Sequence, residues 1–182
     1  MTSDPGARSR CRVWVVMGPS GSGKSTLGAL LAARLEAPFL EGDRFHPPSN
    51  LTKMRQGRPL DDEDRWPWLA AVADAARDLA AENRNVVVAC SALKRAYRDR
   101  LRAGLGEAAE VTLLCPRIDQ DILAGRLGRR EGHFMPASLL DSQLDAFEPP
   151  GPGENAVLLP QGPNPEALVD LCLQAASRTP ST

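Results

Sequence analysis

The stretch GPSGSGKST, residues 18–26, has the residue types and the spacing of a loop that binds phosphate groups. It satisfies the pattern GxxxxGK[ST] and lies between an apolar run and a helical pattern, the context in which that pattern binds nucleoside triphosphates. Its glycines let backbone N–H groups approach phosphate oxygens, and the following helix points its positive end at them. The sequence therefore predicts a nucleotide site made of Gly18, Pro19, Ser20, Gly21, Ser22, Gly23, Lys24, Ser25 and Thr26.

Two side chains of this loop can act on the phosphates directly. We expect Lys24 to be catalytic, because its mobile positive charge can reach the β- and γ-phosphates. Ser25 is the expected metal ligand, because the hydroxyl at this position of the motif binds Mg²⁺. The motif does not by itself separate kinases from switches and motors, since all of these classes share it.

The positions of the acidic residues favour a small-molecule kinase among these classes. The strongest apolar run ends at Cys90 and is followed by Ser91, where a motor ATPase would carry a metal-binding acid. The NKxD and DxxG patterns of a GTPase switch do not occur in the sequence. Glu41 and Asp43 instead follow a short apolar run, where their carboxylates can face the hydroxyl group of an acceptor.

The arginine-rich stretch RLGRREGHF begins at Arg126. A solvated basic helix end is the simpler interpretation of such a charge run. Its glycines interrupt the helical pattern, however, so we favour a mobile lid at about residues 126–136 that closes over the triphosphate and excludes water. We expect Arg126 to bind the nucleotide and Arg130 to be catalytic by neutralising charge in the transition state.

Short apolar runs alternate with longer helical patterns along the chain. They predict strands at residues 11–17, 38–41, 85–90, 110–115 and 155–159, and helices at residues 24–36, 64–83, 93–105, 119–127, 137–147 and 165–176. Continuous apolar strands that alternate with helices are typical of a parallel sheet covered on both faces. We predict an α/β fold of the P-loop NTPase type, a three-layer domain with a five-stranded parallel sheet, helices on both faces and the mobile lid.

Length and composition indicate one domain. We place it at residues 11–177, after a disordered tail (residues 1–10) and before a frayed C-terminus (residues 178–182). With 22 basic and 23 acidic residues, the charge suggests neither nucleic acid nor an anionic membrane as a partner. No apolar run approaches the ~20 residues that span a bilayer. The four cysteines form no CxxC or zinc spacing, so we expect buried reduced thiols and a cytoplasmic protein.

Four further stretches carry a resemblance to a known family. They are GDRFHPPSNLTKMRQGRPLDDEDRWPWL (residues 42–69), CSALKRAYRDRLR (90–102), RREGHF (129–134) and SQLDAFEPP (142–150). In order and spacing they resemble the gluconate kinases (gluconokinases), and the first stretch is far more specific than the phosphate-binding loop. The resemblance implies a shikimate-kinase-like P-loop domain that uses ATP and Mg²⁺ to convert D-gluconate into 6-phospho-D-gluconate. It also makes a homodimer plausible.

The resemblance further implies which residues bind the acceptor. Asp43 matches the aspartate that accepts a hydrogen bond from the attacking hydroxyl, as a base or as an orienting group. The matching substrate-binding residues are Asp43, His46, Arg65, Lys94 and Arg98. Arg65 and Arg98 are preferred as partners of the acid group, because a planar guanidinium suits a carboxylate. Each of these side chains could instead be structural, as a turn cap, a loop residue or a salt-bridge partner.

Other residues in and beside the matching stretches are interpreted more simply. Asp61 and Asp64 precede a helical pattern and are expected to cap it, and Trp68 is expected to pack. Gln143 fits a serine–glutamine pair of the family, which does not reveal its role. Glu41 stands where family members often have aspartate. The sequence therefore does not determine which residue holds the water molecules around the metal.

Two alternatives to gluconate phosphorylation remain open. One is a kinase on the same scaffold with another small acceptor, such as shikimate or a nucleoside monophosphate. The other is a non-catalytic regulator that binds ATP. The joint presence of Asp43, Arg65 and Arg98 argues against the regulator.

Overall fold

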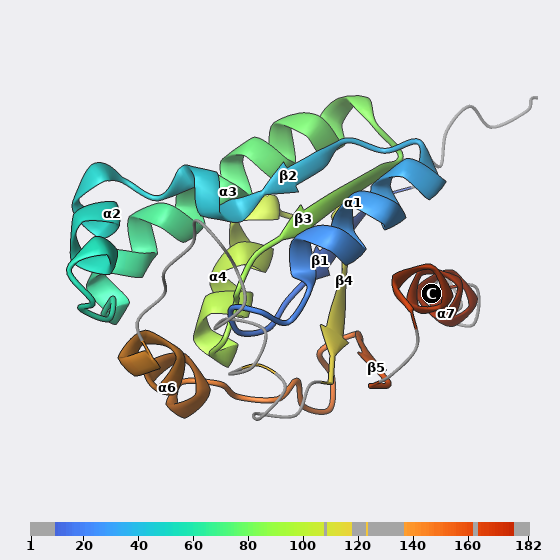
Figure 1. Cartoon of the computed structure of the whole chain (residues 1–182). Coiled ribbons are helices and arrows are strands. Elements are labelled where there is room, and N and C mark those ends of the chain that lie inside the picture. The colour runs from blue at the N-terminus through green and yellow to red at the C-terminus, as the bar shows by residue number, and fades with distance from the viewer. Residues whose placement is uncertain (1–9, 108, 118–122, 124–136, 162–163, 177–182) are drawn as a thin grey trace, which may run out of the picture.

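Five parallel strands form the sheet at the centre of the structure (Figure 1). They are β1 (Cys11–Val16), β2 (Phe39–Glu41), β3 (Asn85–Ala89), β4 (Ala109–Pro116) and β5 (Ala156–Leu159), in the spatial order β2-β3-β1-β4-β5. These elements come from a computed structural model that describes residues 10–107, 109–117, 123, 137–161 and 164–176.

Helices cover both faces of this sheet. α1 (Lys24–Leu35) and α7 (Pro165–Ala176) pack on one face, and α3 (Asp62–Glu82) and α4 (Arg95–Leu105) pack on the other. The other described helices are the 3₁₀ helix η1 (Gly42–Phe45), α2 (Pro48–Arg55) and α6 (Ala137–Asp145). Successive side chains of a strand point to opposite faces. Val13 and Val15 of β1 accordingly share a core cluster with residues of α3 and α4, whereas Trp14 and Val16 share another with residues of α1 and α7. The predicted three-layer α/β fold is therefore confirmed.

The expected elements agree with the observed ones to within about two residues wherever both can be compared. The exception is the polar segment after β2, for which no element was predicted and where the structure has η1 and α2. α2 buries a single residue, Asn50, so it has no apolar stripe by which periodicity could reveal it. The helix predicted at residues 119–127 (apart from Leu123), the lid at residues 126–136, tail residues 1–9 and the frayed C-terminus lie outside the described residues.

The N-terminus of α3 has the predicted cap. The Asp61 side chain accepts a hydrogen bond from the backbone N of Asp64 (2.9 Å), and the Asp64 side chain accepts one from the backbone N of Asp61 (3.1 Å). This reciprocal capping box satisfies two N–H groups that the helix itself cannot pair. It fixes the first turn of α3, which also carries Arg65.

The chain passes very close to β3 at Gly42, directly after β2. A Cβ atom at this position would lie 2.5 Å from the carbonyl oxygen of Ala89, so only glycine fits. This approach places η1, which includes Asp43, at the carboxyl end of β3. Ligands of open α/β sheets bind at this edge of the sheet.

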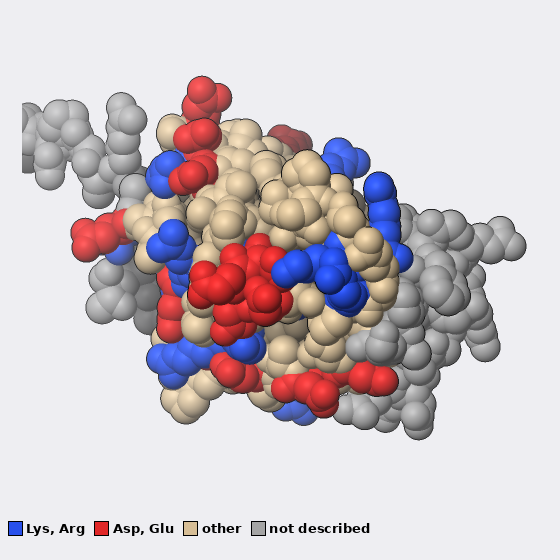
Figure 2. Space-filling view, turned by 90° about the vertical axis from the view of Figure 1, so that its left-hand side faces the viewer, with Lys and Arg blue, Asp and Glu red and all other residues tan. Residues whose placement is uncertain are grey.

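The distribution of charged side chains and the state of the cysteines can be compared with what the composition suggested. On the face shown in Figure 2, acidic and basic side chains lie in separate groups, and neither sign covers the face. Among the described residues, no helix combines the length and the apolar character needed to cross a membrane. All four cysteines are free and buried, as expected.

Candidate active site

The loop between β1 and α1 has the backbone conformation of a phosphate cradle. Gly18, Gly21 and Gly23 have φ angles of 130°, 81° and 86°, in a region that residues with a Cβ atom rarely adopt. No side chain of the described residues caps α1, and no acidic residue lies in its first turn. The positive end of the α1 dipole therefore has no carboxylate of its own first turn beside it, so the residues present fit the triphosphate of ATP.

Lys24 extends over this loop. Its side chain is buried, and its Nζ atom donates a hydrogen bond to the carbonyl oxygen of Pro19 at 3.0 Å. Ser25 and Thr26 follow it in the first turn of α1 and are exposed. Their hydroxyl groups are therefore accessible, as the predicted contacts of Ser25 with Mg²⁺ and of Thr26 with phosphate require.

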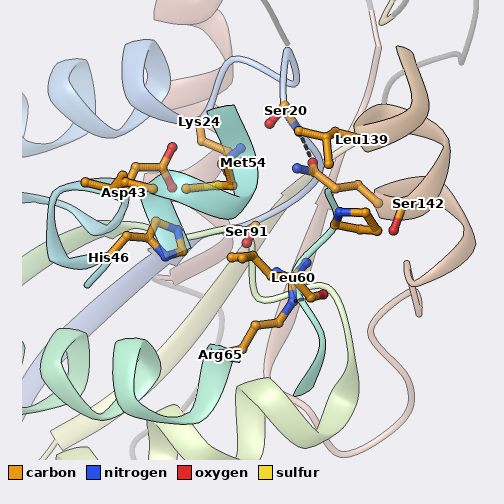
Figure 3. Close-up of a pocket in the computed structure, with 13 residues that line it drawn as sticks. Ser20, Lys24, Asp43, His46, Met54, Leu60, Arg65, Ser91, Leu139 and Ser142 are labelled. Carbon is orange, nitrogen blue, oxygen red and sulfur yellow. Dashed lines mark hydrogen bonds between the residues drawn. The ribbon is translucent and has the colours of Figure 1, made fainter. Parts of the chain in front are cut away.

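A cavity of about 290 Å³ opens beside the phosphate-binding loop (Figure 3). It is enclosed by segments far apart in the sequence: the loop itself, η1, α2, the start of α3, the end of β3 and α6. Its lining residues are Ser20, Lys24, Asp43, His46, Leu51, Met54, Pro59, Leu60, Arg65, Ser91, Leu139, Ser142 and Gln143. Three of the predicted acceptor residues, Asp43, His46 and Arg65, are thus brought together with Lys24.

Asp43 presents its carboxylate to the nucleotide side of this cavity. The residue is exposed although it lies in η1 against the edge of the sheet. Figure 3 shows Asp43 and Lys24 on neighbouring parts of the wall, with the carboxylate turned toward the cavity. A hydroxyl group placed here would lie between a hydrogen-bond acceptor and the charge that attracts the phosphates.

Arg65 presents a buried guanidinium to the same cavity from α3. The residue is 7% exposed, its Nε atom donates to the carbonyl oxygen of Leu60 (3.3 Å), and its guanidinium lies 5.5 Å from the ring centroid of Tyr97. Among the described residues, no carboxylate lies within ion-pair distance of it. A buried charge without a counter-ion is costly, so this arrangement favours an anionic ligand.

Comparisons with known proteins agree with this geometry. Residues 13–150 match the family described as AAA domain. The gluconokinase of Gluconobacter oxydans strain 621H is 45% identical over 159 residues, which cover 87% of this chain and 88% of that protein. The chain belongs to the gluconokinase family. The thermosensitive gluconokinase of Escherichia coli strain K12 is 44% identical over 80% of this chain and 76% of its own length.

Solved structures of a gluconokinase and of a more distant kinase share the fold of this chain. A gluconokinase from Sinorhizobium meliloti 1021 superposes with a TM-score of 0.80 at 42% identity and covers 94% of both chains. The APS kinase CysC of Mycobacterium tuberculosis has the same fold, with a TM-score of 0.64 at 19% identity, covering 92% of this chain and 98% of that one. The chain is therefore a kinase with the P-loop fold, as the sequence predicted.

His46 lines the cavity in a fixed, uncharged form. Its ring stacks on Trp68, with centroids 4.2 Å apart and an interplanar angle of 15°. Burial lowers the pKa of His46 to about 4, and Arg65 acts in the same direction while Asp43 opposes them. The imidazole is therefore neutral at physiological pH, and it can donate or accept a hydrogen bond in this gluconokinase site.

Arg98 lies away from the cavity, in contrast to the contact that the family resemblance implied. Its fully buried guanidinium forms a two-point ion pair with Glu154 (2.7 and 3.0 Å). It also donates to the carbonyl oxygens of Ala92, Leu93 and Glu148. With these donors engaged inside the protein, the arrangement favours a structural role for Arg98, which ties the turn after β3 to the loop before β5.

Lys94 is also turned away from the cavity. Its Nζ atom pairs with Asp62 at 2.7 Å, and Tyr97 donates to the same carboxylate oxygen at 2.5 Å. Lys94 and Tyr97 hold the pKa of Asp62 below its usual range. This placement corresponds to the salt-bridge alternative for Lys94. Arg126 and Arg130, the predicted lid arginines, lie outside the described residues.

The pair of Glu154 with Arg98 predicts a specific pH dependence of stability. Arg98 lowers the pKa of Glu154 from 4.5 to about 2, so the unfolded chain binds the proton more readily than the folded protein. The stabilisation from this group is complete above about pH 4.5 and is lost as the pH falls toward about 2. We expect Glu154→Gln to have a lower free energy of unfolding than wild type at neutral pH. As the pH falls below about 4.5, its free energy of unfolding should decrease less than that of wild type, as measured by urea denaturation. Equal acid slopes in both proteins would contradict this account.

The contacts of two polar lining residues, Gln143 and Ser91, did not follow from the sequence. Gln143 of α6 accepts a hydrogen bond from the backbone N of Ser20 in the phosphate-binding loop at 2.7 Å (Figure 3). Ser91 lines the cavity, and its carbonyl oxygen accepts from the backbone N of Gly18 at 3.1 Å. Only the serine–glutamine pair of the family pointed toward Gln143. Glu41 ends β2 and is not among the residues that line the cavity.

Proposed function

We propose that this chain transfers the γ-phosphoryl group of ATP to D-gluconate and forms 6-phospho-D-gluconate. One observation carries the proposal: the cavity has a carboxylate near the phosphate-binding lysine, and elsewhere on its wall a buried guanidinium that forms no ion pair with a described residue. A molecule with an alcohol at one end and a carboxylate at the other matches both groups. The gluconokinase relatives support the same acceptor.

The residues divide the work of the reaction. Asp43 accepts a hydrogen bond from the attacking hydroxyl and aligns it with the γ-phosphate, and Lys24 neutralises charge that builds up on the phosphate oxygens. Arg65 binds the carboxylate of the sugar acid with its fork of donors. Ser25 would hold Mg²⁺, which when bound neutralises the β- and γ-phosphates. We assign Arg126 and Arg130 to the lid that excludes water.

The size of the cavity favours a small acceptor. A volume of about 290 Å³ lies just below the roughly 300–1,000 Å³ typical of small-molecule sites. A nucleoside monophosphate would also need a surface on which its base can stack. His46 and Trp68 already stack on each other. These features favour a sugar acid over the nucleotide alternative.

A coupled assay of ADP release tests the proposed acceptor. The purified chain with ATP and Mg²⁺ is offered D-gluconate, shikimate, AMP or no acceptor. ADP release that depends on gluconate, with formation of 6-phospho-D-gluconate, is the expected result. Release with shikimate or AMP instead, or none with any acceptor, would overturn the proposal.

The contact between Gln143 and Ser20 predicts a moderate effect on turnover. Gln143→Leu keeps about the size of the side chain and removes the acceptor for the Ser20 N–H group. The phosphate-binding loop then lacks this hydrogen bond to α6. We expect kcat/KM for gluconate to fall about five- to tenfold, the value of one hydrogen bond. Gln161→Leu, at an exposed position after β5, is the control and should retain wild-type kinetics. Equal kinetics for both variants would remove Gln143 from the site.

We also propose that the enzyme works in the cytoplasm as a homodimer. The four buried free thiols support a reducing compartment. The family resemblance supports the dimer, which sedimentation of the purified chain can test.

A further inference from the structure

Asn50 of α2 is a buried polar residue that the proposed mechanism has not used. It is 1% exposed, and it is not among the residues that line the cavity. Its Nδ2 atom donates to the carbonyl oxygen of Asp64 at 2.8 Å and lies 3.3 Å from the Nδ1 atom of His46. Asn50 therefore contacts the cavity residue His46 without lining the cavity itself.

These two contacts determine the direction of both hydrogen bonds. The Asp64 carbonyl oxygen can only accept, so the atom of Asn50 next to it must be the amide nitrogen. The second hydrogen of that NH₂ group is then directed to His46, whose Nδ1 atom must accept it with a lone pair. A neutral imidazole with a lone pair on Nδ1 carries its hydrogen on Nε2.

The ring is also held in orientation. His46 stacks on Trp68, and the Nε1 atom of Trp68 donates to the carbonyl oxygen of Gly42 at 2.8 Å. Because Nδ1 is engaged by Asn50 and His46 lines the cavity, the ring nitrogen left for a ligand is Nε2. Asp43, His46 and Arg65 all line the same wall, so a donor is available in addition to the acceptor of Asp43 and the cation of Arg65.

We infer that Asn50 is a positioning residue that holds His46 as an Nε2–H donor to a hydroxyl oxygen of the acceptor. This inference rests on the proposed function for the identity of that acceptor, a polyhydroxylated acid. A hydroxyl oxygen accepts from Nε2–H, whereas the opposite tautomer would present a lone pair. Asn50 thereby sets the direction of the hydrogen bond between His46 and the substrate hydroxyl group.

The charged groups that face His46 act against each other. Asp43 on η1 favours the imidazolium, Arg65 on α3 disfavours it, and burial disfavours it most. The Asp64 carboxylate is occupied by Lys53 at 2.6 Å and is turned to the cap of α3. The ring consequently has one hydrogen to donate over the physiological pH range.

Nitrogen-15 NMR of the imidazole side chains tests the tautomer without any assay of activity. The chain has only two histidines, so the signals that disappear in His46→Asn belong to His46. We expect wild-type His46 to be neutral at pH 7 with its hydrogen on Nε2, and to shift when gluconate is added. An Nδ1–H or charged ring at pH 7 would overturn the inference.

Asn50→Asp tests whether Asn50 sets this state. The new carboxylate accepts from Nδ1–H instead of donating to Nδ1, so the neutral ring should carry its hydrogen on Nδ1 and present a lone pair at Nε2. The pKa of His46 should also rise by roughly 1–3 units. KM for gluconate should rise about five- to tenfold. KM for ATP should stay within about twofold, because the phosphate cradle is untouched. An unchanged tautomer and an unchanged KM for gluconate would contradict the role of Asn50.

A second variant at Asn50 and a control variant elsewhere complete this experiment. Asn50→Ser removes the amide donor without adding charge, and it should give a mixture of both neutral tautomers if the aspartate variant does not fold. Asn83→Asp, which loses a comparable bond from Nδ2 to the carbonyl oxygen of Leu79 at the end of α3, should leave His46 unchanged. If gluconate proves not to be phosphorylated, the tautomer in the free protein still decides the role of Asn50 independently.

Discussion

Asp43→Asn is expected to lower kcat for gluconate by about 10²–10⁴-fold. The amide has the same shape as the carboxylate but is a weaker acceptor, so the attacking hydroxyl is neither aligned nor relieved of its proton. Asp43 lies in η1 beside the cavity and outside the phosphate-binding loop. KM for ATP should therefore stay within about twofold of wild type. Steady-state kinetics with each substrate varied in turn measures both effects.

Glu63→Gln is the matched control for this substitution. Glu63 is also an exposed acid close to the edge of the site, in the first turn of α3, but it does not line the cavity. Its kcat should equal that of wild type. Wild-type turnover in Asp43→Asn would show that another group orients the acceptor.

Arg65→Met is expected to raise KM for gluconate by at least about 30-fold. Methionine retains the apolar stem and removes the guanidinium, which leaves the carboxylate of the substrate desolvated without a partner. Loss of one member of such a pair costs about 2–5 kcal/mol. The chemical step takes place near Asp43 and Lys24, so kcat should fall much less than affinity.

An uncharged analogue makes this prediction specific. D-Glucitol has an alcohol in place of the carboxylate of gluconate, so its binding should be almost the same in wild type and Arg65→Met. Arg77→Met is the control on the same helix, because Arg77 donates to the carbonyl oxygen of Gly104 and pairs with Asp74 away from the cavity. Parallel losses for gluconate and glucitol would indicate damaged packing instead of a lost carboxylate contact.

The variants also separate the competing functions. A non-catalytic regulator would show no gluconate-dependent ADP release that Asp43→Asn could reduce. A kinase acting on an uncharged acceptor would be insensitive to Arg65→Met. Loss of turnover in the first variant together with loss of affinity in the second is expected only for a kinase with an acidic acceptor.

Local sequence was sufficient for the nucleotide site and for the layers of the fold. The cradle is a run of consecutive residues, and its glycines and Lys24 specify its conformation and chemistry without distant partners. The strands are continuous apolar runs because the sheet is covered on both faces. Neither inference required knowledge of which segments meet in space.

Long-range contacts decided which of two arginines lines the cavity. Arg65 and Arg98 have the same chemistry and both matched the family, so the sequence could not rank them. Arg98 is buried against Glu154, 56 residues later, because the loop before β5 returns to the turn after β3. Arg65 lines the cavity, and no carboxylate of the described residues lies within ion-pair distance of it.

The same reason explains the parts of the acceptor site that the sequence did not reveal. The hydrogen bond from Ser20 to Gln143 joins residues 123 positions apart. α2 brings Asn50 against His46, and this helix has no apolar pattern from which it could be predicted. Residue types and spacing thus determined the family and the cradle, and they pointed to Asp43, which lines the cavity. Only the tertiary structure decided which side chains share the cavity, because burial and hydrogen-bond partners depend on how distant segments pack.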